Sequence, residues 1–204
     1  MQPVTLSGKH IELVPLDLCH VDALAAASAA DPSLYQWSAV PLGKAAVEDY
    51  IKAALAGRDA GLGLAFATVR KQDGAVIGST RFWYVERWPW PKGHARHGRR
   101  DPDACEVGYT WFTASAVRTA ANTEAKLLML QHAFESWQVV RVCLHTDVRN
   151  QRSRAAIERI GGKFEGVLRA HRMGSDFTVR DSYRFSIVAS EWPEVNARLT
   201  KLLD

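Results

Sequence analysis

Hydrophobic and polar positions follow two different periods along this chain, and each period predicts one kind of element. Apolar residues recur every four positions at Val47, Ile51 and Leu55, which predicts an amphipathic helix over residues 44–58. Short runs rich in β-branched and aromatic residues predict strands. An Asp-Gly pair at positions 73–74 lies between two such runs and is a hairpin signal.

Taken together, the segments predict the order β-α-α-β-β-β-α-β-α-β-β-α. Strands are expected at residues 9–16, 63–71, 75–86, 105–112, 139–147, 163–173 and 177–189. Helices are expected at residues 19–30, 44–58, 122–137, 150–160 and 191–204. The alternation of strands and helices in the centre predicts an α+β fold with a mixed, mostly antiparallel sheet flanked by helices. The length fits a single domain over residues 1–204.

Polar and small residues mark the ends of several predicted helices. Asp17 can cap the first helix, and Gly161 stands where the fourth helix should stop. Pro193 falls in the first turn of the last helix, where a missing N–H does no harm. These signals support the helix boundaries that the periodicity predicts.

Residues 87–105 interrupt the pattern with a long loop. The segment holds three of the eight prolines, together with His94 and His97, and residues 87–103 carry five Lys or Arg against two Asp. A loop of this length is uncommon in a compact domain unless it is functional or flexible. It could meet an acidic protein, RNA or an antibiotic, or serve as a dimer arm or a flap. The two histidines have no nearby Cys or His partner, so no metal site is expected.

Composition narrows the class of protein. Hydrophobic residues make up 47% and charged residues 24% of the 204 residues, and the net charge is a mild +4. This balance is compatible with an anionic ligand but does not by itself imply nucleic acid, which is not the expected partner. No apolar run approaches the roughly 20 residues of a membrane span, and the first residues show no signal pattern. Three widely spaced cysteines suggest buried thiols in a reducing compartment, so a cytoplasmic location is expected.

The segment Arg118 to Thr123 leads into the third predicted helix and has two interpretations. Backbone N–H groups at a helix start, with the helix dipole, suit a diphosphate. The alternative is a plain helix start in which Asn122 or Thr123 is the cap and Glu124 lies in the first turn. Taken alone, the residues favour the cap.

The segment 147–166 opens another helix with an Asn-x-x-Ser pair, Asn150 and Ser153. Residues three apart lie on neighbouring rows of one helical face, so both side chains can face one cleft. Asn150 can equally be an ordinary helix cap. Three arginines crowd the same helix start, where cations are locally unfavourable unless an anion is bound: Arg149, Arg152 and Arg154.

The order of elements and these motifs resemble the GNAT superfamily of N-acyltransferases, and within it the branch of ribosomal-protein N-terminal acetyltransferases. The resemblance covers nearly the whole chain and is strongest from Glu106 to Glu165. The family's diphosphate loop runs Gln/Arg-x-x-Gly-x-Gly/Ala. Here Arg118 matches that pattern, while Ala121 and Thr123 depart from it. In this setting the segment is predicted to be a diphosphate loop without its glycines.

The resemblance implies acetyl-CoA as co-substrate and assigns roles to particular residues. Asn150 and Ser153 would lie beside the pantetheine arm and the sulfur, and Ile157 stands where many relatives have a proton-donating tyrosine. Glu106 would serve as base or as an orienting carboxylate. The residues implied for acetyl-CoA binding are Trp111, Phe112, Thr113, Arg118, Thr119, Ala120, Ala121, Asn122, Thr123, Asn150, Ser153 and Arg154. Those implied for catalysis are Ser153, Glu106 and Asn150, with no metal.

The implied reaction moves an acetyl group from acetyl-CoA to a primary amine, either a protein N-terminus or a small molecule. An antibiotic-modifying acetyltransferase, an acyl-CoA-binding module without turnover and an RNA-associated basic protein stay open as alternatives. No membrane partner is expected, and a homodimer is possible. Candidates to line the acceptor side are aromatic: Tyr35, Trp37, Trp83, Tyr84, Trp88 and Trp90.

Overall fold

One mixed sheet of eight strands organises the computed structural model, which describes residues 1–204. The strand order across the sheet is β1-β2-β3-β4-β5-β6-β8-β7. All neighbours are antiparallel except β5 and β6, which are parallel. The strands are β1 Leu6–Ser7, β2 Ile11–Pro15, β3 Leu64–Arg70, β4 Val76–Glu86, β5 Ala104–Phe112, β6 Arg141–Asp147, β7 Lys163–Met173 and β8 Val179–Val188. The predicted α+β fold class is confirmed.

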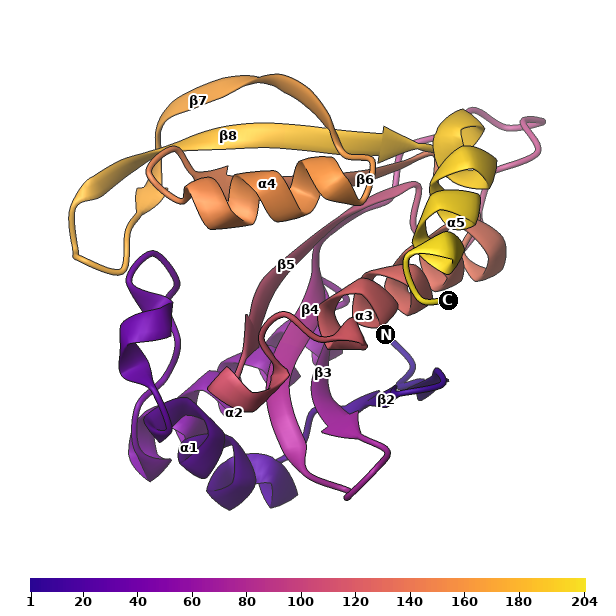
Figure 1. The fold of residues 1–204 in the computed structure, drawn as a ribbon. Coiled ribbons are helices and arrows are strands. Elements are labelled where there is room, and N and C mark those ends of the chain that lie inside the picture. Colours follow the sequence, from indigo (N-terminus) through magenta and orange to yellow (C-terminus); the bar gives the residue numbers. More distant parts are fainter.

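Helices cover the sheet in layers (Figure 1). The α-helices are α1 Val21–Ala29, α2 Lys44–Asp59, α3 Ala120–Gln131, α4 Gln151–Arg159 and α5 Trp192–Lys201. Short helical turns are η1 Leu18–His20, η2 Pro32–Tyr35, η3 Ala114–Ala116, η4 His132–Ser136 and η5 Ala189–Glu191. Helices α1 and α2 pack on β3 and β4, α3 packs on β2 and α5, and α4 packs on β6.

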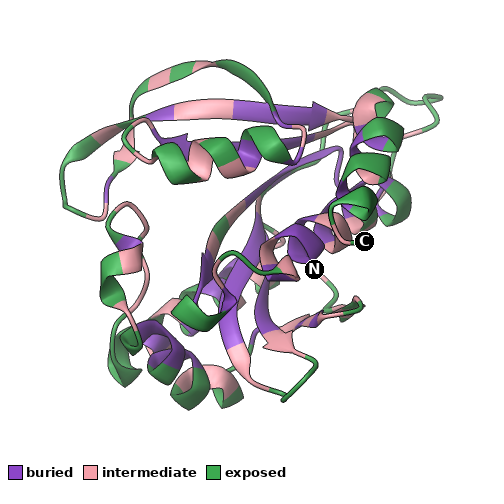
Figure 2. Ribbon diagram, in the orientation of Figure 1, coloured by how far each residue is buried: buried purple, intermediate pink, exposed green.

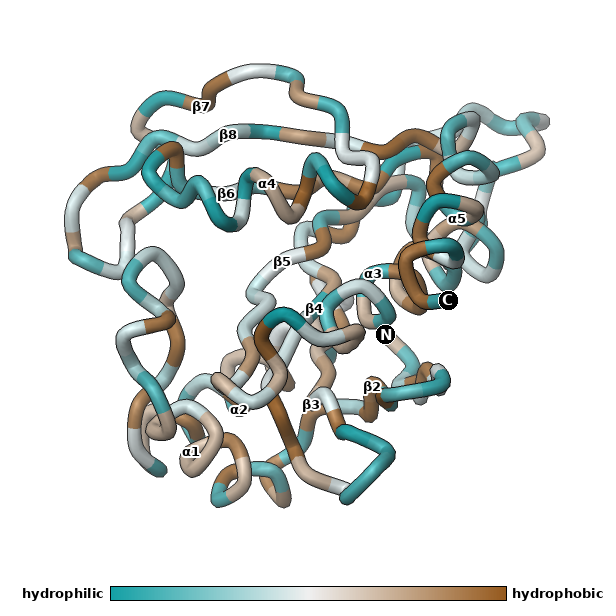
Figure 3. Tube along the Cα trace, viewed as in Figure 1, coloured by the Kyte–Doolittle hydropathy of each residue, from teal (hydrophilic) through white to brown (hydrophobic).

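Two hydrophobic clusters hold these layers together. The larger one joins the sheet to α3, α4 and α5 and includes Phe66, Phe82, Met129 and Phe185, all of them fully buried. The smaller one lies between the sheet and helices α1 and α2, around Leu24 and other residues. Figure 2 shows that the burial is concentrated in the central strands and the inner faces of the helices, and Figure 3 shows hydrophobic residues at the same places.

The pairing of β5 with β6 ends early, and this creates the central opening of the molecule. Only three residue pairs join the two strands, from Ala104↔Arg141 to Glu106↔Cys143. Beyond them Tyr109 adopts a left-handed backbone conformation with φ of 52°. Because that conformation breaks the regular pleat, the second half of β5 diverges from β6. The two strands therefore splay apart beyond their three paired residues.

Helix α3 begins earlier than predicted. Its N-cap is Thr119, whose hydroxyl accepts the N–H of Ala121 at 3.2 Å, so neither Asn122 nor Thr123 is the cap. The preceding Arg118 has φ of 61°, a left-handed conformation that glycine adopts most readily. At its end the helix widens into the π-turn η4, which periodicity alone does not reveal.

The sequence placed Glu124 in the first turn of the third helix, and the structure corrects this. It lies in the second turn of α3, and its carboxylate accepts the backbone N–H groups of Lys9, His10 and Ile11 at 2.6–2.8 Å. A side chain at Gly8 would collide with this carboxylate, since an added Cβ would lie 2.4 Å from its carbon. Glu124 therefore ties α3 to the first strands and does not face the segment around Arg118.

The loop over residues 87–103 is folded onto the body of the protein. The buried carboxylate of Asp103 accepts the backbone N–H of Trp88 and the indole N–H of Trp90, each at 2.8 Å, and pairs with Arg96. Trp90 stacks on His94 with ring centroids 4.2 Å apart. Much of the predicted basic excess is thus used in internal contacts.

The three cysteines differ in exposure. Cys105 and Cys143 are buried free thiols, as predicted, whereas Cys19 is exposed. Burial raises the pKa of the Cys105 thiol well above its usual range.

None of the helices combines the length and the apolar character that a membrane crossing requires.

Candidate active site

A cavity of about 490 Å³ occupies the opening between β5 and β6. Its walls come from β5, β6, the first turns of α3 and α4, the segment after η2, and the β7–β8 hairpin. The predicted site residues that line it are Glu106, Trp111, Phe112, Arg118, Asn122, Asn150 and Ser153. The structure therefore brings together residues that are up to 47 positions apart in the sequence, from Glu106 to Ser153.

The cavity connects the two faces of the sheet. Along β6, Val142 and Leu144 belong to the hydrophobic cluster beneath α4, so the alternating His145 points to the opposite face. Glu106 lies on that opposite face for the same reason, because its neighbours Cys105 and Val107 belong to the cluster. The cavity lining includes residues of both faces. A ligand inside it can therefore reach from α3 and α4 through the sheet.

The first turn of α3 forms one end of the cavity. Arg118 and Asn122 line it, while the N–H of Ala121 is used by the Thr119 cap. By helix geometry the other N–H groups of this turn have no intrahelical acceptor. Of the remaining predicted residues, Thr123 accepts a hydrogen bond from Arg159 of α4 at 3.0 Å. The predicted residues that do not line the cavity are Thr113, Thr119, Ala120, Ala121, Thr123 and Arg154.

Asn150 and Ser153 lie in the cavity wall at the start of α4. The side-chain oxygen of Asn150 accepts the N–H of Ser153 at 3.0 Å, so Asn150 is the N-cap. This bond uses the amide oxygen and leaves the amide NH2 group for a ligand. Ile157 lines the cavity one turn further on and has no proton to donate. Both interpretations of Asn150, cap and cavity residue, are compatible with this geometry.

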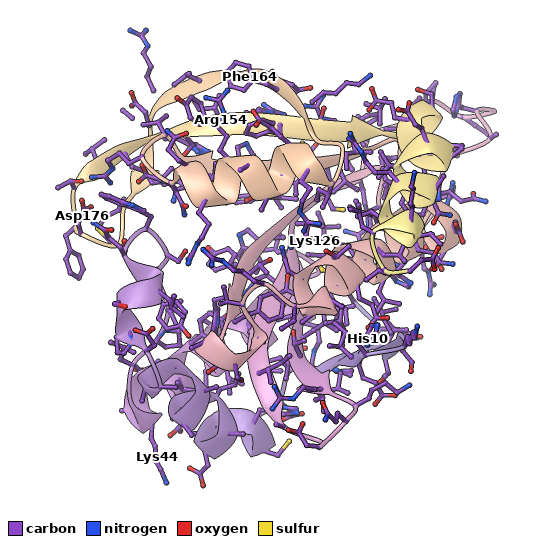
Figure 4. All side chains as sticks on the ribbon, viewed as in Figure 1. His10, Lys44, Lys126, Arg154, Phe164 and Asp176 are labelled. Atoms are coloured by element: carbon purple, nitrogen blue, oxygen red, sulfur yellow. The ribbon has the colours of Figure 1, made fainter.

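The three arginines at this helix start have different surroundings. Arg149 pairs with Asp147 and Asp176, and these hydrogen bonds raise its pKa. Arg154 pairs with Glu158 and packs over Tyr183 on the far side of α4 (Figure 4), and it does not line the cavity.

Arg152 is the member of the trio that does line the cavity. It donates to the carbonyl of Leu34 at 2.6 Å and has no carboxylate partner. An anion at this helix start would therefore meet Arg152, whereas the family resemblance implied Arg154 as the residue that binds it.

Glu106 is the centre of a buried charged cluster that sequence reasoning missed. It is only 4% exposed, and both its oxygens accept from Arg172, at 3.3 and 2.7 Å. His145 Nδ1 lies 3.1 Å from one of these oxygens at an angle too poor for a good hydrogen bond. Gly108 leaves room for the carboxylate, since a Cβ there would lie 3.2 Å from it.

These contacts determine the charge state of Glu106. Burial alone would raise its pKa, but the contacts with His145 and Arg172 lower it to about 2. A carboxylate of such low basicity is a poor general base near neutral pH. The geometry therefore favours the orienting and electrostatic role over the base. Burial and the cation of Arg172 also lower the pKa of the adjacent His171 to about 4.

Lys126 is a cavity residue that the sequence did not single out. It projects from α3 into the cavity, between α3 and α4 in Figure 4, and is 7% exposed. Its Nζ donates to the hydroxyl of Thr110 at 2.5 Å and has no carboxylate partner. Burial lowers the pKa of Lys126 to about 7. The spacing could have indicated Lys126 as a cavity residue, because it follows Asn122 by one helical turn and so lies on the same face of the helix.

Residues 31–40, which we call the bridging segment, close one side of the cavity. The carbonyl of Gln36 accepts the Ser175 hydroxyl at 2.6 Å, and the Arg149 guanidinium lies 4.1 Å from the Trp37 ring centre. Figure 1 shows this segment directly below the turn between β7 and β8. It links the N-terminal half of the molecule to the C-terminal half across the opening.

Of the aromatic residues predicted for the acceptor side, Tyr35 and Trp37 line the cavity. Tyr84 lies outside the lining but contacts Arg172, whose guanidinium is 5.0 Å from its ring centre. The residues that lie away from the cavity are Trp83, Trp88 and Trp90. No residue of the 87–103 loop lines it, so the loop does not form its wall.

This fold and this opening define a class of protein. The sheet splays between its two parallel strands, and a helix start lies at one end of the gap. The family model described as "Acetyltransferase (GNAT) domain" matches residues 10–163. The chain belongs to this family.

Solved structures support the same assignment. A GCN5-related N-acetyltransferase from Brucella melitensis is 27% identical, with a TM-score of 0.83, over 100% of this chain and 87% of that one. RimJ of Mycobacterium smegmatis, solved with CoA-disulfide, is 21% identical over 98% and 95%, with a TM-score of 0.81. RimL, a ribosomal L7/L12 α-N-protein acetyltransferase, is 16% identical over 92% and 96%, with a TM-score of 0.75. The predicted likeness to the ribosomal-protein acetyltransferases is thus confirmed at the level of the fold.

The search of curated proteins returned no significant match. Nowhere in the chain do three or more His, Cys, Asp or Glu side chains gather in a way that could hold a metal ion.

Proposed function

We propose that this protein is an acetyl-CoA-dependent N-acetyltransferase that moves an acetyl group to a primary amine. Residues 1–204 would form its single catalytic domain. The observation that carries the proposal is the cavity through the sheet, which joins a helix start suited to phosphates with a polar opposite mouth. That RimJ was solved with CoA-disulfide supports the same co-substrate here.

Acetyl-CoA would enter from the side of α3 and α4. Its diphosphate would meet Arg118 and the first-turn N–H groups that the Thr119 cap leaves free, such as that of Asn122, where the helix dipole favours negative charge. The edge of β5 that faces away from β4 would hydrogen-bond the pantetheine amides near residues 111–113, as an added strand does. The Phe112 carbonyl on this edge now accepts the Tyr35 hydroxyl at 3.1 Å, and a ligand would replace that bond. The amide NH2 group of Asn150 would contact the same arm, and Arg152 would meet the remaining phosphate.

The reaction would be a direct attack of the amine on the thioester carbonyl. A neutral amine forms the new C–N bond, the C–S bond breaks, the nitrogen releases one proton to solvent, and the CoA thiolate takes up one proton. Ser153 would supply that proton directly or through water, since Ile157 has none to give. A backbone N–H of the splayed strand would polarise the carbonyl. Glu106, held ionised by Arg172, would orient the acceptor.

The acceptor would be a protein N-terminus or a small amine, and the likeness to RimJ and RimL favours the N-terminus. A cytoplasmic location and a homodimer stay predictions. Because the loop at 87–103 does not line the cavity, contact of this loop with a macromolecular acceptor would occur outside the site.

CoA release in the presence of a panel of amines and N-terminal peptides tests the proposal. We expect acetyl-CoA-dependent release with at least one amine, and turnover lower by about tenfold or more in Asn150→Ala and Ser153→Ala. Ser190→Ala, at an exposed position on η5, is the matched control. Acetyl-CoA binding without release for any amine would make the protein a binding module. Unchanged kinetics in both variants would remove these residues from the site.

A further inference from the structure

The mouth of the cavity opposite α3 and α4 has an excess of positive charge. We define this polar mouth by Glu106, His145, Arg172 and Arg180, all of which line the cavity. Arg172 and Arg180 are cross-strand neighbours on β7 and β8. The mouth thus contains two guanidinium groups and one carboxylate.

The single carboxylate is already neutralised. Both oxygens of Glu106 accept from Arg172, so this pair carries no net charge toward a ligand. Asp147, the other acid near Arg180, is bound by Arg149 through both its oxygens. Neither acid is therefore free to compensate Arg180.

Arg180 has an incomplete set of partners. Its Nε donates to the hydroxyl of Ser182 at 3.1 Å, and the guanidinium makes no ion pair. The side chain is half-buried, and burial lowers its pKa. Taking a guanidinium out of water without a counter-ion is unfavourable, and the nearby Arg172 adds repulsion. An anion placed here would relieve both effects.

The phosphates of acetyl-CoA are poorly placed to be that anion. On β8, Phe185 and Ile187 belong to the hydrophobic cluster that reaches α4, so the alternating positions, including Arg180, point to the other face. The start of α3, where the diphosphate would bind, lies on the cluster side of the sheet. The anion must then come from the molecule that enters by the polar mouth.

We propose that the acceptor is a primary amine that also carries a carboxylate or phosphate, and that Arg180 binds this anionic group. The planar fork of a guanidinium matches either anion with two parallel hydrogen bonds. The same charge excess disfavours a protonated amine and so favours the neutral form, which is the nucleophile. This inference rests on the proposed function, because it specifies the substrate class of the same site.

Matched amine pairs test the inference. The pairs are 4-aminobutyrate with its amide, and phosphoethanolamine with ethanolamine, each assayed for kcat/KM at saturating acetyl-CoA. We expect the anionic member of at least one pair to be preferred by about tenfold or more. Arg180→Gln should reduce this preference to within about threefold, and Arg180→Lys should retain part of it. Whichever pair shows the preference identifies the anion.

Arg169→Gln is the control, because Arg169 is exposed on β7 and does not line the cavity. Equal turnover of acid and neutral partner, or a preference that survives Arg180→Gln, would overturn the inference while leaving the proposed function intact. Transfer neither to these four amines nor to any amine or N-terminal peptide of the wider panel would instead contradict the proposed function. Calorimetric binding of the same pairs in the presence of CoA would then decide the inference without turnover.

Discussion

Single residues in the cavity carry charges that burial has changed, and Lys126 is the clearest case. Its amine is enclosed between α3 and β5 with only the Thr110 hydroxyl as a partner. A buried ammonium without a counter-ion destabilises the folded state, and the pKa of about 7 reflects that effect. Because the ordinary lysine pKa is near 10.4, the folded and unfolded states bind protons differently between pH 7 and 10.

Replacing Lys126 should therefore stabilise the protein in a pH-dependent way. Below pH 7 both states are protonated and the full penalty of burial is present. As pH rises from 7 to 10 the unfolded state holds the extra proton, so the free energy of unfolding of the wild type rises. We expect Lys126→Met to gain on the order of 2–4 kcal/mol at pH 6.5 and much less at pH 10, by urea denaturation.

Lys201→Met, at an exposed position on the last helix, provides the control and should show no such trend. A gain in Lys126→Met that stays constant from pH 6.5 to 10 would contradict the assigned charge state of Lys126.

At the scale of elements, the start of α3 shows how the diphosphate end of the cavity is built. Thr119 caps the helix, and Arg118 before it holds a left-handed conformation. The cap fixes the direction of the first-turn N–H groups, on which the proposed phosphate contacts depend. The segment Arg118 to Thr123 thus forms a regular helix start without glycine.

Removing this cap should weaken both the fold and acetyl-CoA binding. Thr119→Ala is expected to lower the free energy of unfolding by about 1 kcal/mol, because the N–H of Ala121 loses its acceptor. Thr119→Ser should restore most of the loss, and Thr200→Ala on an exposed face of α5 should have little effect. If Thr119→Ala and Thr200→Ala proved equally stable, the cap would not hold this helix start.

The sequence predicted elements better than it predicted their ends and their contacts. Periodicity placed the helix over Lys44–Asp59 and most strands correctly, since burial of one face produces the pattern. It missed the two-residue β1 and the π-turn η4, which leave almost no periodic signal. The start of α3 was placed two residues late, because Asn122 and Thr123 are as good caps by composition as Thr119.

Cavity-lining residues were predicted mainly where they belong to a local sequence motif. Asn150, Ser153 and Arg118 were found because they lie in recognisable local patterns. The partners of Glu106 were not found, because Arg172 comes from a distant hairpin, 66 residues along the chain, and long-range pairing leaves no local signature. Arg180 was missed because the cavity that it lines is formed by segments far apart in the sequence.

At the scale of the whole molecule, the bridging segment couples the two halves that β5 and β6 hold apart. Its contacts reach the start of α4 and the turn before β8. Since only three residue pairs join β5 to β6, this segment is a second connection across the opening. It should therefore limit how widely the cavity opens.

Loss of these contacts should loosen the segment. In Trp37→Ala combined with Ser175→Ala, amide hydrogen exchange over residues 31–40 should be faster by about fivefold or more, because local opening needs less free energy. Trp88→Ala, on the loop away from the cavity, should leave exchange in this segment unchanged. Exchange that is equal in the double variant and the wild type would show that the bridge does not close the cavity.

The central claim is that one cavity through the sheet accommodates acetyl-CoA from one face and the amine from the other. A crystal structure with bound acetyl-CoA tests it most directly. The account predicts the diphosphate at the start of α3 beside Arg118, the pantetheine arm along residues 111–113 of the splayed strand, and the acetyl group directed toward Glu106. Acetyl-CoA bound outside this cavity, or with its acetyl group pointing away from the polar mouth, would contradict it.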